Sequence, residues 1–236
     1  MKIALLGDLH GNWAATCAMD KALKTIAPDE IWFLGDSVGK GPSSDKTCDW
    51  VRQNCTVCVG GNWDYGIGFK EFSEDQYFWD MLGEERMAWL RSLPDEAELV
   101  MSGIRFRLFH GRPKMPLMSA QDSRELLEAT FVNGEEKYGG VIFADSHRAF
   151  IRTLNTGYMI NTGSVGINMG VTRAHCLIME GEKDAMEPGL LQMNILSVPY
   201  DRDAALAEVD EHLPHKDSYI NEILTGVYSR NNNASV

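Results

Sequence analysis

Five short clusters of polar residues hold the side chains that could do chemistry in this 236-residue sequence. Each follows an apolar segment, and in chain order they are Asp8-Leu9-His10, Gly35-Asp36, Gly60-Gly61-Asn62, His110-Gly111 and Asp145-Ser146-His147. Together they supply carboxylates, an amide oxygen and imidazoles, a mixed oxygen and nitrogen donor set that Mn²⁺, Fe²⁺ and Zn²⁺ accept. The clusters therefore indicate a divalent-metal site without thiolate ligands.

Each cluster taken alone has a more ordinary interpretation. An aspartate after a strand usually caps a helix, and an isolated histidine is usually only hydrogen-bonded. The order and context of the clusters favour the metal site, because all five follow apolar runs and their glycines permit tight turns close to a ligand. Asn12 keeps a structural interpretation, as the N-cap of the first predicted helix.

The elements that must position these residues are predicted first from the N-terminal third. Apolar runs alternate there with amphipathic stretches, the pattern of a sheet with helical crossovers. The pattern predicts strands at 3–6, 31–34 and 56–59 and helices at 13–26 and 45–53. Ligands of open α/β sheets bind beyond the carboxyl ends of the strands, where the first three clusters lie.

The rest of the chain is predicted to be rich in strands. A helical region at 73–93, ended by Pro94, precedes them, and Asp122 with Glu125 forms a capping-box pair for a helix at 122–131. A helical segment at 202–224 comes last, and the polar tail 229–236 is expected to be disordered. We expect residues 1–228 to form a single α/β domain. The predicted strands are 98–101, 104–109, 141–143, 150–153, 158–160, 175–180 and 190–196.

Composition excludes several classes of protein. A net charge of -12 leaves no basic face to neutralise an extended nucleic acid, although a metal pair could still attract a small phosphate ester. No apolar stretch approaches the roughly 18 residues that span a bilayer, so no membrane partner is expected and the expected compartment is the cytoplasm. The five cysteines lack paired spacing and are expected to be reduced thiols.

With their neighbours, the clusters resemble the five sequence blocks of the calcineurin-like metallophosphoesterases. The matching segments run from Gly7 to Asn12, Gly35 to Asp36, Gly61 to Asp64, Phe109 to Gly111 and Ala144 to His147. The segments 35–42 and 161–166 are similar to those of small bacterial and archaeal phosphodiesterase-like members, and the similarity covers nearly the whole chain. The resemblance implies a four-layer α/β/β/α sandwich with two mixed β-sheets.

The resemblance also implies a centre of two divalent metal ions. The first ion would take its ligands from the first, second and fifth blocks: Asp8, His10, Asp36 and His147. The second would share Asp36 as a bridge and add ligands from the third, fourth and fifth blocks: Asn62, His110 and Asp145. A hydroxide bridging the ions would attack the phosphate, with no covalent phosphoenzyme. Catalytic roles would fall to Asp36, Asn62 and His110, and Asn62 could also donate to a phosphoryl oxygen.

Two positions depart from the family pattern. The family usually has histidine where this chain has Asp145, a harder ligand that favours Mn²⁺ or Mg²⁺-like ions; the alternative is that position 145 is not a ligand. The family also usually has histidine where this chain has Trp63, which has no proton to give a leaving group. We therefore expect Mn²⁺, with iron, Zn²⁺ or Ni²⁺ as alternatives, and a preference for activated leaving groups.

Three basic residues flank the metal clusters: Arg112, Lys114 and Arg148. Arg112 and Arg148 are the candidates for binding the substrate's phosphate, and the alternative is that they are solvated loop charges. The expected function is metal-dependent hydrolysis of a small phosphodiester. A phosphomonoesterase or Ser/Thr-type protein phosphatase, and a binding scaffold with little turnover, remain as alternatives. The sequence does not determine the oligomeric state, and a homo-oligomer is possible.

Overall fold

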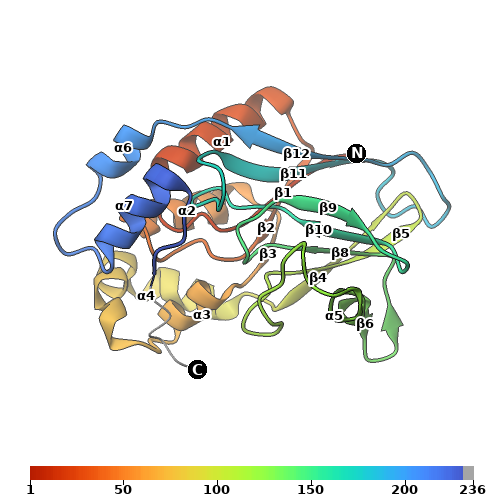
Figure 1. Cartoon of the computed structure of the whole chain (residues 1–236), viewed down its shortest axis with the longest axis horizontal. Helices are drawn as coiled ribbons and strands as arrows, with labels where there is room; N and C mark the ends of the chain where they lie inside the picture. The colour runs from red at the N-terminus through yellow and green to blue at the C-terminus, as the bar shows by residue number, and fades with distance from the viewer. Residues whose placement is uncertain (231–236) are drawn as a thin grey trace.

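Two five-stranded sheets form the centre of the computed structural model, which describes residues 1–230 (Figure 1). The first sheet has the strand order β12-β11-β1-β2-β3. Its strands are β1 (Lys2–Leu6), β2 (Glu30–Leu34), β3 (Val57–Val59), β11 (Ala174–Glu180) and β12 (Gln192–Val198). This sheet is mixed, because β1, β2 and β3 run parallel whereas β11 is antiparallel to both of its neighbours.

The second sheet has the order β4-β5-β8-β10-β9. Its strands are β4 (Glu96–Met101), β5 (Ile104–Phe109), β8 (Gly140–Phe143), β9 (Phe150–Thr153) and β10 (Tyr158–Asn161). The three central strands are parallel and the two edge strands antiparallel to them. A short separate hairpin consists of β6 (Val132–Asn133) and β7 (Glu136–Lys137).

The main core lies between the two sheets. Successive side chains of a strand point to opposite faces, so Ile3 and Leu5 of β1 join a cluster with residues of the second sheet such as Leu108 and Ile142. The alternate residues of β1, Ala4 and Leu6, face away from the second sheet and pack against helices. Both faces of each sheet are therefore apolar.

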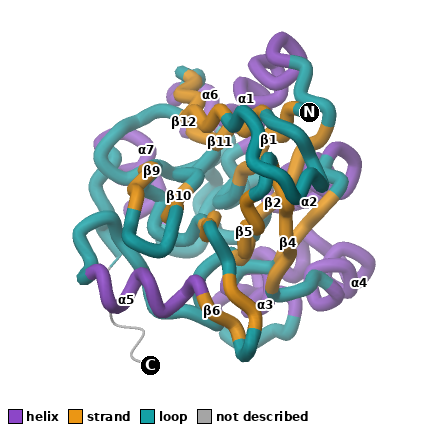
Figure 2. Tube along the Cα trace, turned by 90° about the vertical axis from the view of Figure 1, so that its right-hand side faces the viewer, coloured by secondary structure: helices purple, strands orange, loops and turns teal. Residues whose placement is uncertain are grey.

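Helices cover both outer faces. The helices α1 (Trp13–Ile26) and α2 (Ser44–Asn54) pack on the first sheet, and α5 (Arg124–Glu128) with the 3-10 turn η2 (Ala129–Phe131) packs on the second. Figure 2 shows α1 and α5 on opposite sides of the strands. This arrangement is the predicted four-layer α/β/β/α sandwich with two mixed sheets, which the structure confirms.

A further group of helices packs together beside the sheets around Phe78, Leu90 and Tyr219. It contains α3 (Asn62–Gly68), α4 (Gln76–Ser92), α6 (Arg202–Ala207) and α7 (Lys216–Thr225). Two helical regions predicted from the sequence differ in detail from the helices of the structure. The region 73–93 is the 3-10 turn η1 (Ser73–Asp75) followed by α4, which bends at Gly83 with a φ of 68°. The terminal segment 202–224 is divided between α6 and α7.

The capping box predicted for the helix at 122–131 is wrong. The N-cap of α5 is Ser123, whose side chain accepts a hydrogen bond from the backbone N–H of Leu126. Asp122 accepts instead from the N–H of Ser119 at 2.6 Å, so its carboxylate closes the preceding turn and is not available to the helix.

The first two residues of the predicted tail are ordered by contacts with α7. Ser229 Oγ donates to the carbonyl of Ser218 at 3.3 Å, and Arg230 Nε donates to the Glu222 carboxylate at 3.3 Å. The expectation of disorder therefore fails for Ser229 and Arg230, and the rest of that prediction, 231–236, lies outside the described residues. Within residues 1–230, no helix has the length and apolarity needed to cross a membrane.

Candidate metal centre

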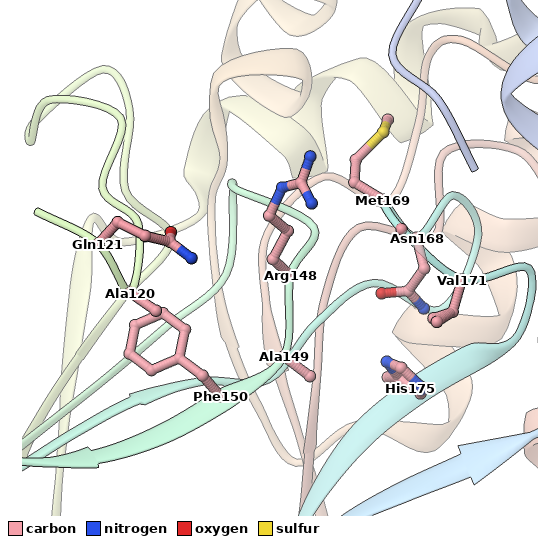
Figure 3. Close-up of a pocket in the computed structure, with 10 residues that line it drawn as sticks. Ala120, Gln121, Arg148, Ala149, Phe150, Asn168, Met169, Val171 and His175 are labelled. Atoms are coloured by element: carbon pink, nitrogen blue, oxygen red, sulfur yellow. The ribbon is translucent and has the colours of Figure 1, made fainter.

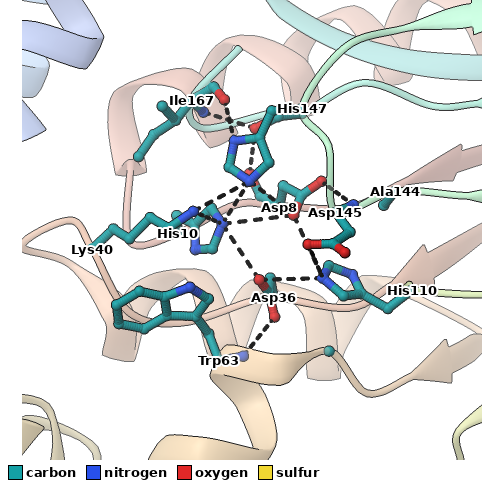
Figure 4. A network of polar contacts seen from close by, with 12 residues as sticks. Asp8, His10, Asp36, Lys40, Trp63, His110, Ala144, Asp145, His147 and Ile167 are labelled. Atoms are coloured by element: carbon teal, nitrogen blue, oxygen red, sulfur yellow. Dashed lines mark hydrogen bonds and ion pairs between the residues drawn. The ribbon is translucent and has the colours of Figure 1, made fainter. Parts of the chain in front are cut away.

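The five predicted clusters meet where the carboxyl ends of β1, β2, β3, β5 and β8 come together (Figure 4). Each cluster occupies the loop after its strand, because the strands within each sheet that carry a cluster are parallel and end at the same edge. The first sheet thus contributes three loops and the second sheet two. The residues brought to this edge are Asp8, His10, Asp36, Asn62, His110, Asp145 and His147.

Two overlapping groups of side chains have the spacing of metal ligands. Asp8, His10 and His147 form one group, and Asp8, Asp36 and His110 form the other, with the ligand atoms of each group within 4.8 Å of one another. In the first group the His10 and His147 Nε2 atoms are 3.1 Å apart, and Asp8 Oδ1 lies 3.3 Å from His147 Nε2. All five residues are buried.

Asp36 belongs to the second group and also lies close to the first, and Asp8 is common to both. Asp36 Oδ2 is 3.5 Å from His10 Nε2 and 3.3 Å from His110 Nε2. Its Oδ1 accepts a hydrogen bond from the backbone N–H of Trp63 at 2.9 Å, which fixes the direction of the carboxylate. This position suits the bridging role that the sequence resemblance implies for Asp36.

Backbone carbonyls fix the orientation of all three imidazoles. The Nδ1 atoms lie 3.2 Å from the carbonyl of Val38 for His10 and 2.7 Å from that of Leu34 for His110, and His147 Nδ1 contacts the carbonyl of Ile167. A carbonyl can only accept, so each Nδ1 carries a proton and each Nε2 faces the centre. This is the outer-shell arrangement that orients histidine ligands of metals.

Three buried atoms at the centre have no hydrogen-bond partner: Asp8 Oδ1, Asn62 Oδ1 and His110 Nε2. Buried polar atoms are nearly always satisfied, because leaving one unpaired costs about 1–3 kcal/mol. All three are Lewis bases, and they lie among further carboxylate oxygens and imidazole nitrogens. The donor set therefore fits divalent cations.

The pKa of His110 also shows that the carboxylates of the centre favour a positive charge among them. Burial disfavours its imidazolium form, but the carboxylates of Asp36, Asp8 and Asp145 outweigh burial and raise the pKa of His110 to about 10. A proton on Nε2 partly neutralises this acidic cluster. A divalent cation would displace that proton, since a ligating imidazole must be neutral.

The backbone at the predicted ligands is strained. Asp8, His10, Asp36, Asp145 and His147 all have φ between 46° and 64°, a conformation that residues other than glycine rarely adopt. Each such residue costs on the order of 1–3 kcal/mol, and strain of this kind clusters at functional sites. Close backbone approach adds a further constraint, because a Cβ on Gly61 would lie 2.2 Å from Asp36 Oδ1.

Asp145 is engaged by an arginine. Its Oδ1 accepts from Arg112 Nη2 at 2.7 Å, and its Oδ2 accepts from the Arg112 backbone N–H at 3.0 Å. Asp145 Oδ1 also lies 3.9 Å from His110 Nε2, so the carboxylate faces both the second ligand group and Arg112. Its role as a metal ligand remains a proposal. The Arg112 side chain is 47% exposed and extends from the centre to the surface.

Exchanging Asp145 for histidine is expected to raise the affinity of the second site for Zn²⁺ relative to Mn²⁺, because imidazole is a softer ligand than carboxylate. Competitive titration of each ion against a chelator measures the ratio. Arg112→Met is the matched control, since it breaks the same ion pair but leaves the carboxylate in place. An unchanged preference in Asp145→His would mean that position 145 serves only Arg112.

Lys40 is a residue of this centre that the sequence interpretation missed. Its Nζ lies 3.0 Å from His10 Nε2 and 3.3 Å from His147 Nε2, and 5.6 Å from the centroid of the Trp63 ring. Burial and the nearby Arg230 guanidinium lower the pKa of Lys40 to about 8. The available signal was its place between Gly39 and Gly41, directly after the second cluster.

Asp64, the last residue of the third sequence block, positions the loops, a role that the sequence interpretation did not assign. Its carboxylate accepts from the backbone N–H groups of Asp36 at 2.7 Å, Ser37 at 2.9 Å and Gly61 at 3.1 Å. Burial and repulsion from Asp36 raise the pKa of Asp64 to about 6. The side chain thus ties the second loop to the third, which explains an aspartate there beside Trp63.

The remaining predicted residues, Asn12, Lys114 and Arg148, lie outside the centre. Asn12 caps α1, as predicted, by accepting from the N–H of Ala15 at 3.1 Å. Lys114 pairs with Asp95 at 2.9 Å. Arg148 is exposed and lines a cavity beside the centre (Figure 3).

The chain is similar in sequence and fold to known proteins. Residues 1–184 match the model of the calcineurin-like phosphoesterase superfamily domain. An uncharacterised protein of Methanocaldococcus jannaschii is 28% identical over 225 residues, covering 84% of this chain and 88% of that protein. A symmetrical bis(5'-nucleosyl)-tetraphosphatase of Erwinia tasmaniensis is 31% identical over 121 residues, 43% of each protein. A metallophosphoesterase structure from Sphaerobacter thermophilus, 23% identical, has a TM-score of 0.73 over 96% of this chain and 99% of its own, and so shares the fold.

Proposed function

Because the chain belongs to the calcineurin-like phosphoesterase superfamily, we propose that it hydrolyses phosphate esters, with diesters preferred, at a centre of two divalent metal ions. The observation that carries the proposal is the convergence of three oriented imidazole Nε2 atoms on the unpartnered oxygens of Asp8 and Asn62. Burying such a set of Lewis bases together is unfavourable unless cations lie among them.

When bound, the metal pair would supply a nucleophilic water at neutral pH and positive charge against the phosphoryl oxygens. His10, His147 and Asp8 would hold one ion, and Asn62 and His110 would hold the other. Asp36 would help to hold both ions. Mn²⁺ is the proposed metal, because carboxylate and amide oxygens accompany the imidazoles and no thiolate does.

Lys40 and Arg112 would hold the phosphate of the substrate. The Lys40 ammonium lies at the two Nε2 atoms of the first ligand group, and it must turn aside when an ion binds there, because two cations in contact repel. Its stem beside Trp63 keeps it near the centre, where it can donate to a phosphoryl oxygen. Arg112, held by Asp145, offers a charge-assisted donor on the surface side.

Replacing Lys40 by methionine is expected to tighten the first metal site about tenfold and to raise KM about tenfold. The first effect follows from removing a competing cation, and the second from losing a charged donor to the phosphate, each worth about 1.4 kcal/mol. Metal titration against a chelator and steady-state kinetics measure the two effects separately. Lys183→Met is the control, because Lys183 also lies over a tryptophan, 5.5 Å from the Trp32 centroid, but away from the centre. Weaker metal binding in Lys40→Met would contradict the proposal.

Two features bear on the choice of ester. Trp63 stands beside the centre and has no acidic proton for a leaving group, which favours leaving groups that are weak bases, as in aryl diesters and phosphoanhydrides. The partial match to a bis(5'-nucleosyl)-tetraphosphatase supports substrates of that kind. A phosphomonoesterase is the second candidate, because the two cations Lys40 and Arg112 would also suit a dianionic monoester.

The proposed function is tested by metal analysis of the purified protein together with an activity screen in Mn²⁺. We expect two ions per chain after loading, and faster hydrolysis of bis(p-nitrophenyl) phosphate than of p-nitrophenyl phosphate. The reverse order of rates would favour the monoesterase. Stable metal binding without turnover of either ester would favour a binding scaffold, and failure to bind metal would contradict the proposed centre.

A further inference from the structure

A cavity of about 310 Å³ lies next to the metal centre, in the size range of small-molecule sites, which begins at about 300 Å³ (Figure 3). Its walls come from the loop after β8, from the start of β9, from the loop at 168–171 and from the segment at 120–121. The side chains that give it chemical character are Arg148, Phe150, Gln121 and His175.

Two loops separate the cavity from the centre, and both contact or contain His147, a proposed metal ligand. His147 directly precedes Arg148, so the two residues present side chains to the centre and to the cavity respectively. The His147 carbonyl accepts from the N–H of Met169, at 3.0 Å, while its Nδ1 contacts the carbonyl of Ile167. A substrate whose phosphate lies at the metal ions could therefore extend past His147 into the cavity.

Polar groups in the cavity have unused hydrogen-bonding capacity. Among residues 1–230 the exposed Arg148 guanidinium makes no ion pair or side-chain hydrogen bond. An arginine without an acidic partner is unexpected in a chain with a net charge of -12, where acidic residues are abundant. The Nδ1 atom of His175 is buried without a partner, although its Nε2 contacts Ser197 Oγ at 3.0 Å.

The cavity also presents a fixed aromatic ring. Phe150 packs edge to face against Phe143, with centroids 5.8 Å apart and planes at 72°, so its orientation is set by the outer face of the second sheet. Ala149 and Met169 add apolar surface beside it. A ring held in this way can stack on a planar heterocycle, while a guanidinium nearby pairs with an anionic group.

We propose that this cavity binds the nucleoside portion of a nucleotide ester, with the base against Phe150 and a phosphate that is not cleaved against Arg148. The inference rests on the proposed function and specifies its substrate class. The metal ions and their ligands would act on one phosphorus atom, and the cavity would select esters that carry a nucleotide.

Two diesters with the same p-nitrophenolate leaving group test the proposal: thymidine 3'-phosphate 5'-(p-nitrophenyl phosphate), whose 3'-phosphate is not cleaved, and methyl p-nitrophenyl phosphate. In Mn²⁺-loaded protein, Arg148→Ala and Phe150→Leu should each lower kcat/KM for the nucleotide ester about tenfold, mainly through KM. Both variants should leave the methyl ester within about twofold of wild type, because that substrate cannot reach the cavity. Lys137→Ala, which removes an exposed charge elsewhere, is the control.

Calorimetric binding of adenosine 5'-monophosphate to metal-free protein separates this proposal from the proposed function. Binding that weakens in both cavity variants supports the nucleotide site even if neither ester is hydrolysed. Equal losses for the two esters in the cavity variants, or no loss for either, would overturn it. So would nucleotide binding that is lost in Lys40→Met but kept in Arg148→Ala, because the nucleotide would then lie at the metal centre.

Discussion

Replacing Asp36 by asparagine is expected to remove most of the bound metal and to lower hydrolysis at least about a thousandfold. Asp36 Oδ2 is close to a histidine of each ligand group, 3.5 Å from His10 Nε2 and 3.3 Å from His110 Nε2. A neutral amide cannot neutralise two dications. Losing the metal pair removes several kcal/mol of transition-state stabilisation, and about 4 kcal/mol is already a thousandfold in rate.

The fold should survive this substitution. The Oδ1 of Asp36 accepts from the Trp63 N–H, and an asparagine oxygen can accept the same hydrogen bond. Metal analysis, hydrolysis of an aryl diester and thermal unfolding of the metal-free protein measure the three expectations. Asp80→Asn is the matched control, because this exposed aspartate accepts from Gln76 far from the centre. A folded Asp36→Asn variant with two ions and wild-type activity would show that the dinuclear assignment is wrong.

The second large effect concerns the missing imidazole at position 63. General acid catalysis contributes about 10²–10⁴-fold when a leaving oxygen must be protonated, and much less for weakly basic leaving groups. The Trp63 ring meets the His10 ring edge to face, with centroids 5.9 Å apart, so this position borders the centre. Wild-type rates should therefore fall steeply as the leaving-group pKa rises, and Trp63→His should make that slope shallower.

A series of phosphate esters with graded leaving groups, measured in saturating Mn²⁺, determines both slopes. Trp63→Phe is the control, because it changes the ring without supplying an acid and should keep the steep slope. A flat wild-type slope, with chemistry shown to be rate-limiting, would mean that another group donates the proton. Lys40 would be the first to examine, because the carboxylate of Asp64 is occupied by three backbone N–H groups.

The local sequence determined the strands and the donor atoms that follow them. A continuous run of apolar residues such as Ile3, Ala4 and Leu5 specifies a strand buried on both faces, and the polar residue after a glycine marks where it ends. Parallel strands end at one edge, so Asp8, Asp36 and the other donors could be placed together without coordinates. The fold followed from the order of these blocks, which resembles one family throughout.

Helix details depended on interactions that the sequence pattern does not show. Asp122 and Ser123 are adjacent candidates for the same cap, and only the turn closed by Asp122 onto Ser119 left the cap to Ser123. Arg230 was assigned to a tail because its neighbours are polar. In the structure, Arg230 instead contacts Glu222, a buried carboxylate on α7.

The contacts of the long basic side chains depended on the tertiary structure and could not be predicted from the sequence. Lys40 reaches His147, 107 residues away, and Arg112 reaches Asp145, 33 residues away, whereas Arg148 faces the cavity although its neighbour His147 faces the centre. The backbone after a strand fixes where a short donor such as Asp36 or His110 lies. A lysine or arginine has several rotatable bonds, and its direction is set by the charges and rings that the opposite sheet and the packed helices bring within reach.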